Sequence, residues 1–390
     1  MKLMKILYYY WGELIAESAK QAMKRMGTEV TIISPKRIKY DDDIAFMTVV
    51  REALKISDGQ SEYDAIFSFN YFPDLSRVAN ECGVQYVSWV YDSPHLTLES
   101  ITLNNPCNKV YIFDYLLYAN YIDSGITTVE YMPLPARIIE KKDVGQNGYK
   151  HDITFIGNLY DGEQDQYGKI GYLPEYIAGY LDSIIVAQQC IYGEDLFRTL
   201  VSREIYAGIS KYVNIGLGDK YHDCSIEIFR DMLRRRVTMN ERLNALSRLG
   251  NEFGSDKVDL YCGTDHSNLP VKNNGFADYA EEMPYIFATS KININITLRS
   301  IQSGIPLRVM DILGAGGFCI TNYQPEIAEY FENGVDIVWY EDIDDLVAKC
   351  RYYLEHDEER ERIAIAGQKK AEELFEFGQQ FRKVLSSIEE

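Results

Sequence analysis

Short apolar runs alternate with amphipathic stretches along the first third of the chain. The run KILYYYW is followed by a helical pattern at residues 13–26, then by Gly27 and the apolar run TEVTIIS. Strand, helix and strand in this order predict a right-handed parallel unit. Most later apolar runs end at polar or turn residues, which is typical of the carboxyl edge of a parallel sheet, where ligands bind. These runs predict strands at 63–69, 84–92, 109–114 and 127–133.

A second α/β pattern follows a polar stretch at residues 136–150, which we interpret as a linker after a first domain at 1–135. The apolar run DITFIGNLYDG opens a second domain, predicted to span 151–370. Within it, residues 172–250 are mostly helical by periodicity, with amphipathic segments around 175–191 and 226–249, and predict a helical insertion. A further strand is predicted at 257–266. A chain of 390 residues is long enough for two such α/β domains.

Residues 291–322 contain the most informative pattern. They predict a strand, a polar loop with Ser303 and Gly304, a short helix with Arg308 and Asp311, and a second strand. A loop that leads into a helix N-terminus presents unpaired N–H groups and the positive end of the helix dipole, which suits a phosphate. The planar guanidinium of Arg308 can form two parallel hydrogen bonds to a phosphate. Asp311 lies near the same helix face, where it can accept hydrogen bonds from two ribose hydroxyls, so the pattern predicts a nucleotide site.

An Arg and an Asp at this spacing also form ordinary surface ion pairs, and that interpretation stays open beside the nucleotide site. Gly314, Gly316 and Gly317 stand between the helix and the apolar run FCIT. Such a dense group of glycines indicates close approach of the backbone to neighbouring structure. The glycines therefore favour the nucleotide interpretation.

The charge balance narrows the class of ligand. Lys and Arg number 40 against 59 for Asp and Glu, which gives a net charge of −19. A nucleic-acid partner needs a basic surface, so that class is excluded, whereas a local cation such as Arg308 can still hold a diphosphate. The five histidines lie far apart, and no H-E-x-x-H motif occurs. We therefore expect neither a metal site nor a bound cofactor.

Cysteine usage indicates the compartment. The seven cysteines form no C-x-x-C pair, which is typical of a reducing environment. The start MKLMKILYYYW is interrupted by Glu13 and Glu17, and no run approaches the length of a membrane span. We expect a cytoplasmic protein without a transmembrane segment. The 31 tyrosines are compatible with a homo-oligomer but do not require one.

Four segments, namely MP at 283–284, KININIT, GIPLRVMDILGAGG and ITNYQPE, resemble the donor-binding domain of the CgeB-like, spore-maturation-type glycosyltransferases. The similarity continues through residues 331–367 and returns weakly upstream at RVTMNERLNALSRLG. The resemblance implies the GT-B architecture, two facing Rossmann-like domains with a nucleotide sugar in the cleft, here with the helical insertion in the C-terminal domain. It also implies sugar transfer without a required metal ion, and a terminal helix at 371–390 that returns to the first domain.

One departure concerns the stereochemistry of transfer. Many retaining GT-B enzymes place two glutamates around the helix where this chain has Ser303 and Asp311. Asp311, at the second position, can still bind the ribose. The departure at these two positions affects more strongly any inference about whether transfer inverts or retains the anomeric configuration.

The resemblance implies further donor-site residues. Arg242 matches a family position that faces the donor, although taken alone it is more typical of a solvated helix arginine. Gly263 ends a strand placed where GT-B enzymes recognise the nucleobase. The complete predicted donor site is Gly157, Asn158, Arg242, Gly263, Asn295, Ser303, Gly304, Ile305, Pro306, Arg308 and Asp311.

Asp92 and His95 directly follow the predicted strand VQYVSWVYD. In GT-B enzymes this strand end meets the acceptor, which makes Asp92 the candidate catalytic base and His95 a second catalytic candidate. An Asp before Pro94 also caps turns and helices well, and a lone His near a helix start is commonly a polar contact. Both alternatives stay open.

Together these patterns predict a metal-independent glycosyltransferase of the hexosyltransferase type, with a UDP-sugar as the favoured donor. Its partners would be the nucleotide sugar and a hydroxyl group on a glycan, protein or cell-surface acceptor. Two alternatives stay open: a non-catalytic subunit that binds a nucleotide or glycan, and a sugar-nucleotide epimerase on the same fold.

Overall fold

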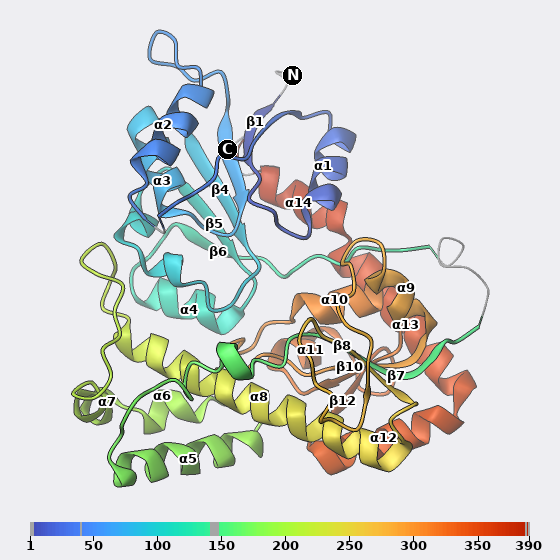
Figure 1. Ribbon diagram of the computed structural model, residues 1–390. Helices are drawn as coiled ribbons and strands as arrows, with labels where there is room; N and C mark the ends of the chain where they lie inside the picture. The colour runs from blue at the N-terminus through green and yellow to red at the C-terminus, as the bar shows by residue number, and fades with distance from the viewer. Residues whose placement is uncertain (1–3, 40, 141–147, 387, 389–390) are drawn as a thin grey trace. The chain divides into compact units, whose positions relative to one another are not determined.

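The computed structural model describes residues 4–39, 41–140, 148–386 and 388 (Figure 1). By its internal contacts the chain divides into two compact units. The first unit contains residues 1–135, 217–223 and 375–390, and the second contains 136–216 and 224–374. Within the described ranges, no helix is long and apolar enough to cross a bilayer.

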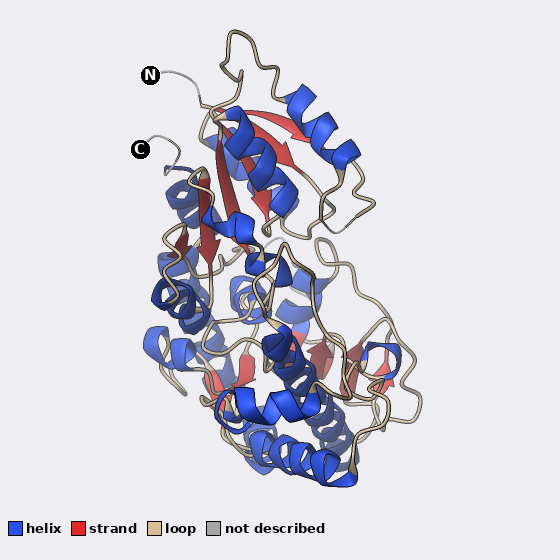
Figure 2. Cartoon of the chain, turned by 90° about the vertical axis from the view of Figure 1, so that its left-hand side faces the viewer, coloured by secondary structure: helices blue, strands red, loops and turns tan. Residues whose placement is uncertain are grey.

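The first unit is built on a parallel sheet of six strands in the order β2-β1-β3-β4-β5-β6. Strands such as AIFSF are buried along their whole length, because helices cover both faces of this sheet (Figure 2). Each strand lies within the apolar run that predicted it, except that β5 begins one residue earlier, at Asn108. The bounds are β1 Lys5–Tyr9, β2 Glu29–Ile33, β3 Ala65–Phe69, β4 Gln85–Val90, β5 Asn108–Ile112 and β6 Val129–Tyr131.

Different helices cover the two faces of the first sheet (Figures 1 and 2). On one face, the core includes Phe46 of α2 and Leu75 of α3. On the other, Phe377 and Phe381 of α14 pack on the ring of Trp89 from β4, and α14 also contacts α1. The helix bounds are α1 Ala16–Arg25, α2 Ile44–Ala53, α3 Pro73–Cys82, α4 Tyr115–Asp123 and α14 Phe377–Ser386.

The C-terminal helix differs from the prediction at its start. The expected boundary at residue 371 falls inside α13, Asp357–Phe375, and the helix breaks at Glu376. The Glu376 carboxylate accepts hydrogen bonds from the N–H groups of Gly378 and Gln379, so it caps the first turn of α14. This cap starts a separate helix whose apolar stripe belongs to the first unit.

The second unit contains another six-stranded parallel sheet, in the order β12-β11-β10-β7-β8-β9. Its centre is apolar, with Ile153, Ile292 and Ile320 fully buried on adjacent strands. The short strands β9 and β12 were not predicted, whereas the other four lie in predicted runs. The bounds are β7 His151–Ile156, β8 Val258–Tyr261, β9 Lys272–Asn273, β10 Ser290–Asn295, β11 Cys319–Asn322 and β12 Val338–Tyr340.

The predicted helical insertion contains α5, α6, α7 and the long helix α8, of which α5 and α8 lie side by side (Figure 1). The first half of α8 packs on α5 and α6 in a separate apolar cluster that includes Leu181, Phe197 and Leu233. Its second half, with Ala245 and Leu249, belongs to the core of the sheet. The bounds are α5 Glu175–Gln189, α6 Leu196–Leu200, α7 Arg203–Ile209 and α8 Ser225–Phe253.

One part of the insertion is not helical. Residues 210–224 form turns and extended chain, and residues 217–223 belong to the first unit. There, the N–H of Ile101 donates to the carbonyl of Lys220 at 3.1 Å, and Tyr221 forms a bridge with Ser100. The remaining helices of the second unit are α9 Met283–Thr289, α10 Leu307–Gly314, α11 Pro325–Tyr330, α12 Ile343–Glu355 and α13.

Candidate functional site

The strand order of the second sheet locates a crevice. From β7 the chain moves outward through β8 and β9, then returns to β10 on the other side of β7 and continues to β11 and β12. Loops after β7 and β10 therefore leave in opposite directions, and ligands of open α/β sheets bind at such a switch point, outside the carboxyl ends of the strands. Gly157 and Asn158 follow β7 here, and Ile296 follows β10.

Arg242 of α8 joins the two loops at this switch point. Its Nε and Nη2 donate to the carbonyl of Ile296 at 3.2 and 2.5 Å, and its Nη1 donates to the carbonyl of Asn158. The guanidinium also lies over the rings of Phe155 and Tyr160, with centroid distances of 5.4 and 5.0 Å. Two predicted site residues, Asn158 and Arg242, therefore meet here.

The charge of Arg242 is buried without an acidic partner. Only 8% of the residue is exposed, and within the described residues no carboxylate pairs with it; its Nε, Nη1 and Nη2 donate to backbone carbonyls. Burial lowers the pKa of Arg242, and the positive charge of Arg308 lowers it further. A buried arginine normally has an anionic partner. This switch point therefore favours an anionic ligand.

The predicted phosphate loop is held firmly in place. The Ser303 hydroxyl donates to Glu326 Oε1 at 2.6 Å, and the Ser303 carbonyl accepts from the Glu326 N–H at 3.2 Å, which ties the loop to α11. Gly304, Ile305 and Pro306 are buried. Pro306 is extended and no side chain caps α10. The loop thus presents the N-terminus of α10 through its backbone, and the hydroxyl of Ser303 serves structure.

Asn295 also has structural partners. Its Nδ2 donates to Thr297 Oγ1 at 3.0 Å and to Thr321 Oγ1 at 2.8 Å. These bonds join the carboxyl ends of β10 and β11 below the loop. The structure therefore gives Asn295 a supporting position beside the switch point.

Arg308 and Asp311 meet on α10 as their spacing predicts. Arg308 Nη1 lies 3.3 Å from Asp311 Oδ2, and the Tyr279 hydroxyl donates to Asp311 Oδ1 at 2.8 Å. The side chain of Asp311 is only 12% exposed, unlike that of a surface ion pair. Burial raises the pKa of Asp311, while Arg308, the Tyr279 hydrogen bond and Arg137 oppose that change.

A pocket of about 270 Å³ opens beside Asp311. Its apolar lining includes Phe287 and Met283, and its polar groups are Asp311, Tyr279 and Arg137. An apolar pocket with a few fixed polar groups is typical of a small-molecule site. Its chemistry suits a nucleoside, because the rings can pack on a base while the carboxylate accepts hydrogen bonds from ribose hydroxyls.

Gly263 lies apart from this pocket, in the loop after β8, and is not among the described residues that line it. The side chains around it bond to one another: Thr264 Oγ1 lies 2.7 Å from His266 Nε2, and Cys262 Sγ lies 3.6 Å from the same nitrogen. The structure therefore does not bring Gly263 together with Asp311.

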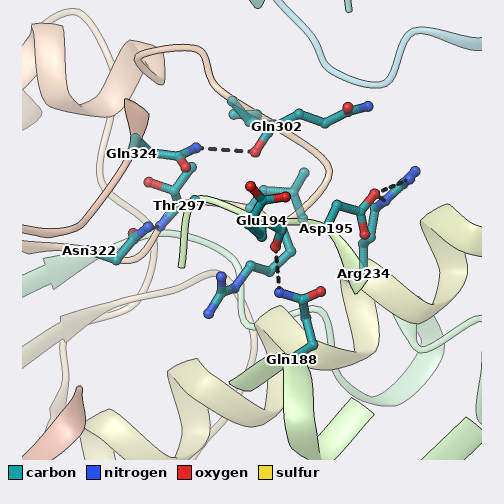
Figure 3. A pocket seen from close by; sticks show the side chains of 12 residues that line it. Gln188, Glu194, Asp195, Arg234, Thr297, Gln302, Asn322 and Gln324 are labelled. Atoms are coloured by element: carbon teal, nitrogen blue, oxygen red, sulfur yellow. Dashed lines mark hydrogen bonds and ion pairs between the residues drawn. The ribbon is translucent and has the colours of Figure 1, made fainter. Parts of the chain in front are cut away.

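A second hollow, of about 370 Å³, opens where the helical insertion meets the ends of β10 and β11 (Figure 3). Its lining is polar, but its two arginines are paired with carboxylates. Arg234 Nη2 lies 2.5 Å from Asp195 Oδ2, and Arg299 pairs with Glu241. Because these cations already have carboxylate partners, this hollow lacks the uncompensated charge that distinguishes Arg242.

The candidate catalytic residues lie at the carboxyl edge of the first sheet. Asp92 is exposed, and its Oδ2 accepts a hydrogen bond from Asn70 Nδ2 at 2.7 Å. It contacts the loop after β3 in this way and caps no described helix. His95 Nε2 lies 3.0 Å from the carbonyl oxygen of Tyr71. Burial lowers the pKa of His95, whereas the Tyr71 carbonyl and the charge of Asp92 act in the opposite direction.

Comparison with known proteins agrees with this geometry. Residues 234–386 match a family described as glycosyl transferase-like. No curated protein matches the chain. A glycosyltransferase from Rickettsia africae is similar over 100% of this chain and 98% of its own, with a TM-score of 0.54 and 10% identity. Sucrose-phosphate synthase from Thermosynechococcus elongatus is similar over 99% and 98%, with a TM-score of 0.53 and 9% identity. The chain has the GT-B fold.

A third GT-B structure, Anabaena HepE in complex with UDP-glucose, is similar over 99% of both chains, with a TM-score of 0.52 and 11% identity. At such low identity these likenesses establish the GT-B fold and leave the residues of the site to be argued from their own geometry.

Three features of this GT-B site were missed or misjudged from sequence. Arg137 falls in the predicted linker, and Tyr279 lies in a loop without periodicity, so no local signal marked either as a neighbour of Asp311. The interpretation of Arg242 as a solvated arginine is wrong, because the turn of α8 that carries it faces the sheet. Only the family resemblance had pointed to that residue.

Proposed function

We propose that this protein is a glycosyltransferase of the CgeB-like type, which moves a hexosyl group from a nucleotide-diphosphate sugar to an acceptor hydroxyl without a required metal ion. The observation that supports this most strongly is the buried Arg242, which joins both loops of the switch point and has no carboxylate partner among the described residues. An anionic ligand at this point would supply the missing negative charge.

In this proposal the diphosphate binds near Arg242 and Arg308, at the N-terminus of α10. The nucleoside enters the pocket beside Asp311, whose carboxylate accepts hydrogen bonds from the ribose. The guanidinium groups and helix N–H groups then stabilise the negative charge that develops on the leaving diphosphate. In metal-dependent enzymes a metal ion fills this role.

The transfer itself needs a base. The acceptor oxygen forms a bond to the anomeric carbon, the bond from that carbon to the phosphate oxygen breaks, and the diphosphate leaves with the bonding electrons. We assign the acceptor proton to the exposed carboxylate of Asp92. His95 is the weaker candidate, because its ring is tied to the Tyr71 carbonyl.

The choice of donor follows from the comparison structures. Anabaena HepE was solved with UDP and with UDP-glucose, and it has the same fold as this chain. We infer that a UDP-sugar is the donor here. We also place the protein in the cytoplasm, since none of the seven cysteines, all of them among the described residues, forms a disulfide.

The test is calorimetric titration of UDP into the wild type and into Arg308→Ala. Removal of this guanidinium should weaken UDP binding by about 1.5–3 kcal/mol, or about 10- to 150-fold. Arg351→Ala is the matched control, because Arg351 pairs with Glu252 at the surface and is 54% exposed. It should bind UDP like the wild type. Equal affinity of Arg308→Ala and the wild type would remove Arg308 from the site.

The same preparation separates the alternative functions. Release of UDP from a UDP-sugar only in the presence of an acceptor indicates transfer. Conversion of the sugar without an acceptor would indicate an epimerase. Binding of UDP with no turnover under any condition would indicate a non-catalytic subunit.

A further inference from the structure

The first sheet has its own switch point, between β1 and β3. From β1 the chain moves outward to β2, then returns to β3 and continues through β4, β5 and β6. The loops after β1 and β3 therefore diverge, and ligands are expected outside their carboxyl ends. Trp11 occupies this point: it follows β1, and its indole Nε1 donates to the carbonyl of Phe69, the last residue of β3, at 2.8 Å.

The backbone around Trp11 is fixed by buried polar groups. Gly12 has a φ of +104°, which a residue with a side chain rarely adopts. This bend returns Glu13 toward the sheet, where Glu13 Oε2 accepts from the Trp11 N–H at 3.0 Å and Oε1 accepts from the Tyr8 hydroxyl. Glu13 is only 4% exposed. Both the backbone and the indole N–H of Trp11 are thus held in one position.

The ring of Trp11 remains 38% exposed although its N–H is satisfied internally. The ring of Tyr91 lies beside it, with an interplanar angle of 10° and a centroid distance of 6.2 Å. Tyr91 is itself held by its N–H, which donates to Asn70 Oδ1 at 3.1 Å. We call these two nearly parallel rings the Trp11–Tyr91 shelf. Fixed polar atoms and a partly exposed pair of aromatic rings indicate a surface prepared for a ligand.

Polar groups of the right kind adjoin the shelf. Asp92 follows Tyr91 directly in the chain, and its exposed carboxylate is held by the amide of Asn70. Aromatic planes suit the apolar C–H faces of a pyranose ring, while an exposed carboxylate suits its hydroxyls. Stacked nucleic-acid bases would also suit the rings, but the net charge of −19 disfavours that ligand.

We propose that the Trp11–Tyr91 shelf binds a pyranose ring of a glycan acceptor and presents one of its hydroxyls to Asp92. The inference rests on the proposed transferase function and narrows its acceptor to a carbohydrate. In the transfer step the hydroxyl oxygen bonds to the donor's anomeric carbon, its proton passes to Asp92, and the nucleoside diphosphate leaves with the electrons of the broken bond.

Binding is measured first on the full-length wild type, without any need for turnover. Saturation-transfer NMR with maltose, cellobiose, lactose and di-N-acetylchitobiose, each with and without UDP, should detect contact with at least one saccharide. A serine- and threonine-containing peptide serves as the contrasting probe. A saturation-transfer signal from the peptide alone would overturn the proposed role of the shelf. So would the absence of a signal from every probe while UDP binds.

The decisive variant is Trp11→Leu, which keeps apolar volume but removes the aromatic face. For the responding saccharide, affinity or acceptor KM should worsen about three- to tenfold, with the affinity for UDP unchanged. Trp11→Phe should recover part of the loss. Tyr176→Leu, which changes a 75% exposed aromatic on α5, is the control and should behave like the wild type.

The outcomes separate the shelf from the function on which it rests. If Trp11→Leu and Tyr91→Leu both bind the saccharide as tightly as the wild type does, the proposed role of the shelf is wrong, but the proposed donor site is unaffected. If Trp11→Leu does not fold, Tyr91→Leu and Trp11→Phe provide the same test. Failure of the wild type to bind any nucleotide overturns the proposed function itself.

Discussion

The two sheets offer the same architecture with opposite chemistry at their switch points. In the second unit, the loops after β7 and β10 surround a buried cation, Arg242, that no described carboxylate neutralises. In the first unit, the loops after β1 and β3 surround a buried carboxylate, Glu13, an exposed one, Asp92, and a fixed aromatic face.

The difference shows how one fold is divided between two kinds of ligand. Strand order places a binding crevice in each unit, but the side chains decide what enters it. In the proposed function, the uncompensated cation selects a diphosphate, whereas the rings beside a carboxylate select a neutral molecule with hydroxyl groups. The proposed donor and acceptor roles thus differ in the sign of the local charge.

The largest effect should come from the substitution of Asp92 in the first unit. Asp92→Asn removes the proposed base and keeps the shape of the side chain, so kcat should fall about 10²- to 10⁴-fold. The affinity for UDP should not change, because the proposed base acts on the acceptor hydroxyl and has no role in holding the nucleotide. Acceptor-dependent UDP release and calorimetry measure the two quantities. Full activity in Asp92→Asn would show that another group takes the proton.

A smaller effect is expected at Asp311. The Asp311→Asn variant should weaken UDP binding by about 1–2 kcal/mol, because ribose hydroxyls donate less strongly to an amide oxygen than to a carboxylate. The preference for UDP over 2′-deoxy-UDP should shrink as well. Asp344→Asn is the control, because Asp344 is 78% exposed in a surface ion pair. An unchanged preference for the ribonucleotide would place the ribose elsewhere.

The same variant should alter the pH dependence of stability. Burial raises the pKa of Asp311 in the folded state, so the folded protein keeps this proton where the unfolded chain has already released it. Stability therefore falls as pH rises from the ordinary Asp pKa to the raised one. Urea unfolding across that range should show a fall in the wild type that Asp311→Asn lacks. If the free energy of unfolding changes with pH in the same way in both proteins, the pKa of Asp311 is not raised.

The smallest effect should follow removal of metal ions. If Arg242, Arg308 and the N-terminus of α10 neutralise the diphosphate, the affinity for UDP should be the same in EDTA and in magnesium. Calorimetry in the two buffers makes the comparison. If the affinity for UDP depended strongly on magnesium, the guanidinium groups and the N-terminus of α10 would not be enough to neutralise the diphosphate.

Much of the fold could be predicted because its signals are local. The strands around β10 and β11 and the helix α10 lie where apolar runs and glycines predict them. The strands β9 and β12 are too short to produce a pattern. Residues 210–224 lie between the two amphipathic segments of the predicted insertion and carry no helical signal of their own; they form turns and extended chain, and residues 217–223 belong to the first unit.

The site was less predictable, because its residues meet only through tertiary structure. The pair Arg308–Asp311 follows from helical spacing alone. The contact between Tyr279 and Asp311, by contrast, joins a patternless loop to α10 across 32 positions of sequence. The buried state of Arg242 depends on how α8 packs, which a single amphipathic pattern does not reveal.

The most direct test of the central claim is a crystal structure of the protein with UDP. The account predicts diphosphate oxygens within hydrogen-bonding distance of Arg242 or Arg308 at the N-terminus of α10, and the ribose on Asp311 with the base in the adjoining pocket. UDP bound at the Trp11–Tyr91 shelf or in the hollow beside Arg234 would contradict it.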